Sequence, residues 1–133
     1  MLASSFAVAL GGAAGSLARY WLAELFAASG MSAFPWATLA ANVSGSVLIG
    51  LIAALTGPDG RVLVAPDVRL FWMVGVCGGY TTFSSFSLQT LTLAQGGEWG
   101  KAGLNVVLSV VLCLLAVWLG YLAAAWLNRL QGA

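Results

Sequence analysis

The sequence predicts an all-α integral membrane protein with four transmembrane helices, and both composition and length support this. Hydrophobic residues make up 61% of the chain and charged residues 7%, with a mean hydropathy of +0.97. A soluble domain carries about 25% charged residues. A spanning helix needs roughly 20 residues, so four helices with short connections use nearly all of the 133 residues. We therefore expect a single transmembrane domain over residues 1–133.

Clusters of turn residues divide the chain into four apolar segments. The densest cluster is TGPDG at 56–60, and residues 57–69 hold four of the nine charged residues, which indicates the main aqueous loop. The first segment lacks a basic start and is as long as a full span, so we expect a retained helix and no cleaved signal. The expected spans cover residues 3–27, 36–55, 70–94 and 101–127.

The first span combines small residues with one cation. Gly11 and Gly15 form a GxxxG pair, which lets two helices approach closely in lipid. Arg19 is the only cation that lies inside an expected span and not at its first or last residue. An intramembrane charge usually marks a functional site, but an arginine near a helix end can also extend to the interface. The sequence leaves both interpretations of Arg19 open.

The second span contains an amide, Asn42, a turn or two from its start. An unpaired amide in hydrocarbon costs several kcal/mol, on the order of 2–7, so the side chain must face protein or water. It either forms an interhelical hydrogen bond, worth about 1 kcal/mol, or donates to an ion on a polar path. Taken alone, the residue favours the interhelical bond.

The third span is the most informative, because its middle is unsuited to a plain membrane anchor. Gly78–Ser87 reads GGYTTFSSFS, with two glycines, two threonines and three serines. Interrupted backbone is tolerated at membrane depth only when it is buried in protein or lines a wet cavity. The segment therefore predicts a helix break and a site, most simply for an ion. Phe83 and Phe86 share a helix face; they are either core residues or, through their positive ring edges, part of an anion path.

The fourth span has a polar stripe on an otherwise apolar helix. Asn105, Ser109 and Cys113 recur every four residues and therefore lie on one face. The stripe is explained equally well by contacts between helices and by a pore lining.

The positive charges are nearly balanced between the two sides of the expected bundle. Arg61, Arg69 and Arg129 fall on one side, and Lys101 and Arg19 on the other. Orientation in the membrane follows Lys/Arg asymmetry, and three against two is hardly an asymmetry. The count leaves open both insertion in two orientations and a weak bias toward one.

Several function classes lack support in the composition. No basic tract suited to nucleic acid is present. The chain has no histidine and only four carboxylates, so a serine nucleophile in the third span has no obvious activating base. Cys77 and Cys113 show no metal-type spacing and are interpreted as buried apolar thiols.

Taken together, the motifs resemble those of the Fluc/CrcB family of microbial fluoride channels, over the whole chain. Gly78–Ser87 is similar to the family's GGxTTFSTFS-type signature on the third helix. Gly11–Tyr20 is similar to its GGxxGxxxR motif, and Thr38–Asn42 to its TLxxN entry to the second helix. The sequence departs from the family pattern at Gln89, where many members have glutamate, and at Ser85, where threonine is common.

The resemblance implies a passive channel that exports cytoplasmic fluoride through two pores in an antiparallel, dual-topology homodimer. It further implies a location in the plasma membrane of a prokaryote, the inner membrane if the cell is Gram-negative. A structural Na⁺ ion on the dimer axis is implied, held by the backbone carbonyls of Gly78 and Thr81. The implied fluoride-path residues are Asn42, Phe83, Ser84, Ser85, Phe86, Asn105 and Ser109, and Arg19 is a further motif residue without an assigned role.

Two other functions remain as alternatives. A small multidrug-type dual-topology transporter has the same size, but it depends on a membrane-embedded carboxylate, for which Glu24 is the only candidate near a span. A non-transporting membrane assembly subunit would use the same motifs for packing alone.

Overall fold

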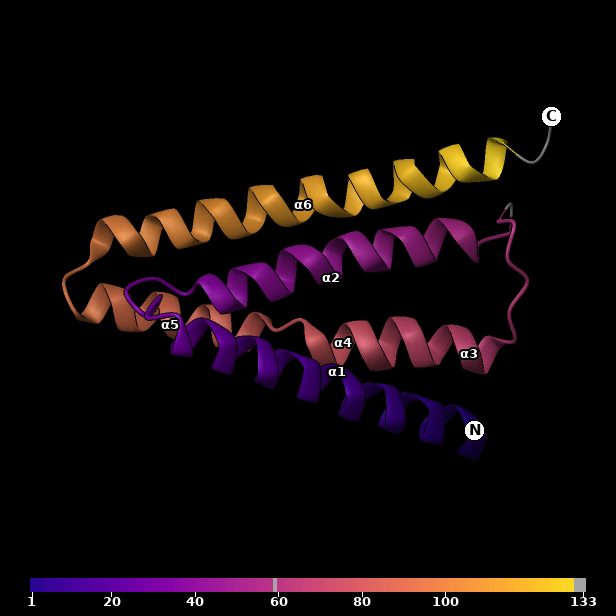
Figure 1. Ribbon diagram of the computed structural model, residues 1–133, viewed down its shortest axis with the longest axis horizontal. Helices are drawn as coiled ribbons and strands as arrows, with labels where there is room; N and C mark the ends of the chain where they lie inside the picture. Colours follow the sequence, from indigo (N-terminus) through magenta and orange to yellow (C-terminus); the bar gives the residue numbers. More distant parts are fainter. Residues whose placement is uncertain (59, 131–133) are drawn as a thin grey trace.

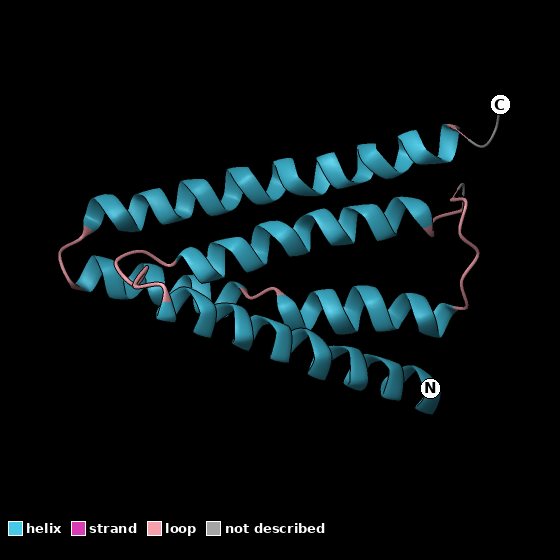
Figure 2. Ribbon diagram, in the orientation of Figure 1, coloured by secondary structure: helices cyan, strands magenta, loops and turns pink. Residues whose placement is uncertain are grey.

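The computed structural model describes residues 1–58 and 60–130, and this part of the chain consists of helices and loops without a strand (Figures 1 and 2). Three helices are continuous: α1 (Leu2–Ala28), α2 (Trp36–Leu55) and α6 (Trp99–Arg129). The remaining segment is assembled from α3 (Pro66–Leu70), the π-helix η1 (Phe71–Cys77), α4 (Gly78–Tyr80) and α5 (Phe83–Gln95). The all-α fold class is therefore confirmed. Asp59, assigned above to the main loop, lies outside the described residues.

The four helical segments run alongside one another in alternating directions. Figure 1 shows α6 packed along α2, and α1 packed along α3, η1 and α4. The start of α1 and the end of α6 lie at one end of the molecule, together with the connection between α2 and α3. This arrangement is what an even number of passes requires. Two helices, α2 and α6, are long and apolar enough to cross a membrane.

Small residues set the distance between the paired helices, as the GxxxG pattern predicts. Gly11 and Gly15 are buried, and a Cβ on Gly15 would lie 2.8 Å from the backbone nitrogen of Tyr80. A Cβ on Gly120 of α6 would lie 3.1 Å from Cα of Val47 in α2. Backbone therefore packs against backbone at both contacts, as expected in a lipid environment. The buried core is correspondingly rich in alanine: Ala41, Ala54, Ala102, Ala116 and Ala124.

The third segment begins earlier and breaks later than the glycines alone suggest. Pro66 occupies the first turn of α3, with Asp67 beside it, and both residues favour a helix start. Gly78 and Gly79 are helical. The break falls instead at Thr81 (φ −82°, ψ 156°) and Thr82 (φ −153°, ψ 115°). The expected glycine–threonine break is thus located at its threonine end, and Gly79 serves close packing against Gly12.

Candidate ion-binding site

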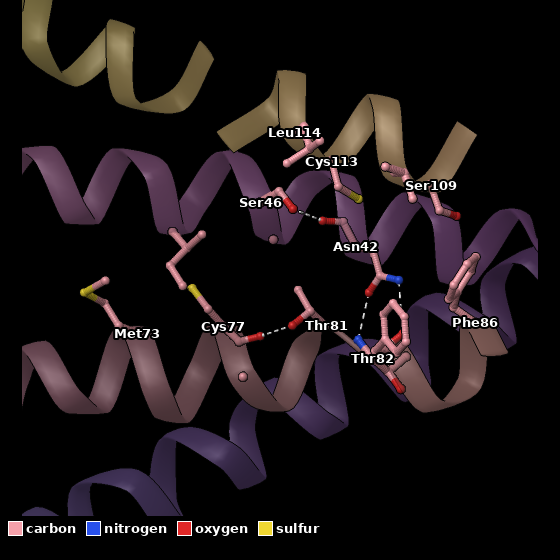
Figure 3. Close-up of a pocket in the computed structure, with 15 residues that line it drawn as sticks. Asn42, Ser46, Met73, Cys77, Thr81, Thr82, Phe86, Ser109, Cys113 and Leu114 are labelled. Carbon is pink, nitrogen blue, oxygen red and sulfur yellow. Dashed lines mark hydrogen bonds between the residues drawn. The ribbon is translucent and has the colours of Figure 1, made fainter. Parts of the chain in front are cut away.

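The break is held open by the side chain of Asn42 on α2. Its Oδ1 accepts a hydrogen bond from the Thr82 backbone N–H at 2.7 Å, and its Nδ2 donates to the Thr82 carbonyl at 3.1 Å. One amide thus satisfies both polar groups of an extended residue, as Figure 3 shows. Because unpaired backbone groups are costly to bury, this pairing replaces the bonds that Thr82 would make in a continuous helix.

Capture of Thr82 has a consequence for the preceding turn. In a continuous helix the Thr82 N–H would donate to the Gly78 carbonyl, four residues earlier. In the same continuous helix the Thr81 carbonyl would accept from the Ser85 N–H. The Ser85 N–H instead donates to Thr82 Oγ1 at 3.2 Å, so that Thr82 caps the start of α5. The carbonyl oxygens of Gly78 and Thr81 therefore both lose their usual helical donors and are available to other groups.

These two carbonyls are chemically suited to a hard monovalent cation. Oxygen ligands are preferred by hard cations, and unwound backbone supplies them at ion sites in membrane transporters. No group of three or more His, Cys, Asp or Glu side chains that could hold a metal occurs in residues 1–58 and 60–130. The expected carbonyl ligands thus fit sodium, and a transition-metal site of side chains is not found in that part of the chain.

The break lies beside a cavity of about 440 Å³ between α2, the third segment and α6 (Figure 3). Its walls are mostly apolar with a few polar groups, including Asn42, Thr81 and Ser109. Ser46 Oγ, also on the wall, donates to the Asn42 carbonyl at 2.7 Å. The full lining is Asn42, Gly45, Ser46, Ile49, Met73, Cys77, Gly78, Thr81, Thr82, Phe83, Phe86, Ser109, Val110, Cys113 and Leu114.

The two phenylalanines lie together on the first turn of α5, as their spacing predicts. Their ring centroids are 5.2 Å apart and the ring planes meet at 53°. Phe86 is 7% exposed and belongs to the core, whereas Phe83 is 77% exposed on the surface of the single chain. Phe83 therefore places an aromatic ring on the outer surface at the edge of the cavity.

Neither of the two serines between the phenylalanines, Ser84 and Ser85, lines this cavity. Ser84 Oγ lies 3.2 Å from Thr82 Oγ1, and Thr82 Oγ1 donates to Ser85 Oγ at 3.1 Å. Ser85 lines a second cavity of about 360 Å³ with Arg19 and Gln89. The structure therefore separates Ser85 from the phenylalanine face.

The polar stripe of α6 is divided between two environments. Ser109 and Cys113 line the central cavity. Asn105, 2% exposed, donates instead to Thr90 Oγ1 at 2.8 Å, and Thr90 Oγ1 donates to the Phe86 carbonyl at 2.8 Å. In this single chain Asn105 ties α6 to α5 behind Phe86 and does not line the cavity.

The second cavity collects the remaining motif residues, Arg19 and Gln89. Arg19 Nε donates to the Gly79 carbonyl at 3.3 Å. Gln89 Oε1 is buried without a hydrogen-bond partner in residues 1–58 and 60–130. The full lining is Ser16, Arg19, Tyr20, Ala23, Ala37, Thr38, Ser85 and Gln89.

Sequence reasoning did not identify Thr82 as the residue on which the site depends, nor Thr90 as the partner of Asn105. The capping of α5 by Thr82 has a sequence signal, since a threonine before a helix start is a favoured N-cap. The pairing of Asn42 with Thr82 joins residues 40 positions apart and has no local signal.

The outer faces of this helical bundle are apolar, and its helix break is stabilised by a side chain beside a cavity. This combination is typical of membrane transport proteins, in which broken helices line substrate and ion sites. The chain belongs to the CrcB family: the family model described as "CrcB-like protein, Camphor Resistance (CrcB)" matches residues 6–121.

Curated relatives resemble the chain along almost its full length. A protein of Paramagnetospirillum magneticum named "Fluoride-specific ion channel FluC" is 63% identical over 122 residues, covering 92% of this chain and 95% of the relative. The protein of the same name from Rhodospirillum rubrum gives the same identity and coverage. A third, from Opitutus terrae, is 58% identical over 126 residues, covering 95% and 96%.

Proposed function

We propose that this protein is a passive, fluoride-selective ion channel that exports fluoride through the plasma membrane of a bacterial cell. The observation that carries the proposal is the helix break, held by Asn42 beside Phe83 and Phe86, in a chain 63% identical to proteins named fluoride-specific ion channels. The same observations favour a channel over an enzyme.

The chemistry of the cavity is suited to a small, strongly hydrated anion. A pore for fluoride must replace its water with hydrogen-bond donors, yet it must not bind so strongly that the ion stays. Asn42 uses one of its two Nδ2 hydrogens on Thr82, and the second is available to an ion in the cavity. Ser109 adds a hydroxyl, and the edges of Phe83 and Phe86 add weak positive charge. None of these groups carries a fixed charge that would trap the ion.

We further propose that the functional unit is an antiparallel homodimer of four-span subunits, with two pores. Gly78 and Phe83 are both exposed on the cavity side of the single chain, so a second subunit can cover them. The nearly balanced count of lysine and arginine permits either orientation. Carbonyls of Gly78 and Thr81 from two inverted subunits would supply four oxygens for a sodium ion, which would neutralise their converging dipoles.

Labelling of a single cysteine tests the inverted arrangement. Asp59→Cys in a Cys77→Ala, Cys113→Ala background should react with an impermeant maleimide from both sides of the membrane. Reaction from one side only, in a chain that still dimerises, would contradict the antiparallel dimer.

Planar-bilayer recording tests the channel activity. Currents under a fluoride gradient should reverse at the equilibrium potential of fluoride, because a passive selective pathway has no other driving force. A reversal potential that follows chloride or protons would contradict the proposal.

The transporter alternative needs a carboxylate, and Glu24 is exposed on α1 and lines neither cavity.

A further inference from the structure

The guanidinium of Arg19 reaches the helix break from α1, whereas Asn42 reaches it from α2. Its Nε donates to the Gly79 carbonyl at 3.3 Å, and Ser16 Oγ, one turn earlier on α1, donates to the same oxygen at 3.5 Å. We infer that Arg19 is a positioning residue for the sodium site: by holding the Gly79 carbonyl, it keeps the neighbouring Gly78 and Thr81 carbonyls free to bind the ion. This inference rests on the proposed sodium site.

The bond to Arg19 has a competitor within the chain. In a continuous helix the Gly79 carbonyl would accept from the N–H of Phe83, the first residue of α5. Occupation of Gly79 O by donors from α1 disfavours that closure. Asn42 Oδ1 accepts from the Thr82 N–H, which in a continuous helix would donate to the Gly78 carbonyl. Side chains of α1 and α2 thus bond to two backbone groups that successive helical hydrogen bonds would use across the break, the Gly79 carbonyl and the Thr82 N–H.

The geometry fixes the peptide plane next to the proposed ligand. The Gly79 carbonyl is attached to the Gly79–Tyr80 peptide, which directly follows the peptide that carries the Gly78 carbonyl. A Cβ on Gly79 would lie 3.0 Å from Cα of Gly12, so α1 and α4 are in backbone contact there. Arg19 is partly buried, and a hydrogen bond from a charged donor is about twice as strong as a neutral one.

Charge and hydrogen bonding make opposite predictions for sodium. If Arg19 affected the site only through its positive charge, it would repel the cation, and removing the charge would strengthen sodium binding. If it acts by positioning the carbonyl, loss of the donor should weaken sodium binding. The sign of the change therefore separates the two roles.

Two substitutions isolate the donor. Arg19→Gln places an amide nitrogen where Nε stands, keeping a donor without the charge, whereas Arg19→Met places a methyl group there and removes both. Sodium is added to the purified protein in a buffer that initially contains none, and the melting temperature is measured at each concentration. The quantity compared is the sodium concentration that gives half of the maximal rise in melting temperature. We expect Arg19→Met to raise this concentration at least fivefold and Arg19→Gln to leave it within twofold or lower it.

The outcomes are distinct. A decrease or no change in Arg19→Met overturns the inference. If Arg19→Met does not fold, Arg19→Gln decides alone, because a fivefold increase in its sodium requirement contradicts a positioning role for the donor. A wild-type melting temperature that does not respond to sodium overturns the sodium site and this inference together. Melting does not depend on fluoride transport, so a failure of the channel proposal is seen separately, in bilayer recordings.

Discussion

Asn42→Asp is the sharpest perturbation that the structure offers, because it exchanges one donor for an acceptor at almost constant shape. The carboxylate would still accept from the Thr82 N–H, now 2.7 Å from Oδ1. It would also set a second negative oxygen against the Thr82 carbonyl, at the position where Nδ2 lies 3.1 Å away. The substitution therefore removes one of the two hydrogen bonds between residue 42 and Thr82, and it adds negative charge to the cavity wall.

The magnitude follows from the single lost bond. A hydrogen bond contributes about 1 kcal/mol net, and facing acceptors add about as much in repulsion. A total of about 2 kcal/mol corresponds to roughly a thirtyfold change in the equilibrium ratio of the broken to the continuous helix. Repulsion of fluoride by the carboxylate acts in the same direction. We expect fluoride flux to fall at least thirtyfold.

The assay is fluoride release from liposomes, measured with a fluoride electrode, with size-exclusion chromatography to verify the dimer. Asn128→Asp is the matched control, since Asn128 also accepts from a backbone N–H, of Arg61 at 3.3 Å, and donates to a backbone carbonyl, of Ala54 at 3.0 Å. It lies at the far end of α2 and α6, and its flux should remain within twofold of wild type. Normal flux in a well-folded Asn42→Asp dimer would refute the reasoning and leave Asn42 a packing residue.

Three further predictions follow from the same geometry. Phe83→Ile and Phe86→Ile should each cut fluoride efflux at least tenfold. Only Phe86→Ile should lower the melting temperature, because Phe86 is buried and Phe83 is 77% exposed. Near-normal efflux in both variants would exclude the aromatic path. Gly78→Leu should abolish the sodium-dependent rise in melting temperature, whereas Thr81→Ala should retain it. A Cβ on Gly78 meets nothing within 4 Å in the single chain, so the cost of the leucine would arise at the proposed second subunit. Equal sodium responses of the two variants would contradict the ligand assignment. Gly15→Val should lose the peak of the proposed dimer in size-exclusion chromatography. Its Cβ would lie 2.8 Å from the Tyr80 nitrogen of the same chain, so the subunit itself would be distorted. A normal peak would show that α1 can move aside.

The sequence was sufficient for features that depend on local chemistry. The bounds of α2 follow from Pro35 at its start and the turn cluster after Leu55, and the close approach of α1 follows from Gly11 and Gly15. These signals are local because a proline, or a missing Cβ, acts wherever it stands.

The details of the site depend on contacts that no local pattern contains. Gly78 and Gly79 permit a break, yet they remain helical, because the capture of Thr82 by Asn42 decides where the helix opens. Asn105 was expected on the fluoride path, and in the single chain its amide is bonded to Thr90. Ser85 follows Phe83 by two residues, so the helix turns it toward Arg19. Each of these positions is fixed by a partner on another helix.

The most direct test of the central claim is electrode-detected fluoride release from liposomes that contain this purified protein alone. When a potassium ionophore balances the charge, we predict rapid and complete release of fluoride with chloride retained, from wild type but not from Asn42→Asp. Retention of fluoride by liposomes that hold the folded wild-type dimer would contradict the claim that this chain is a fluoride channel.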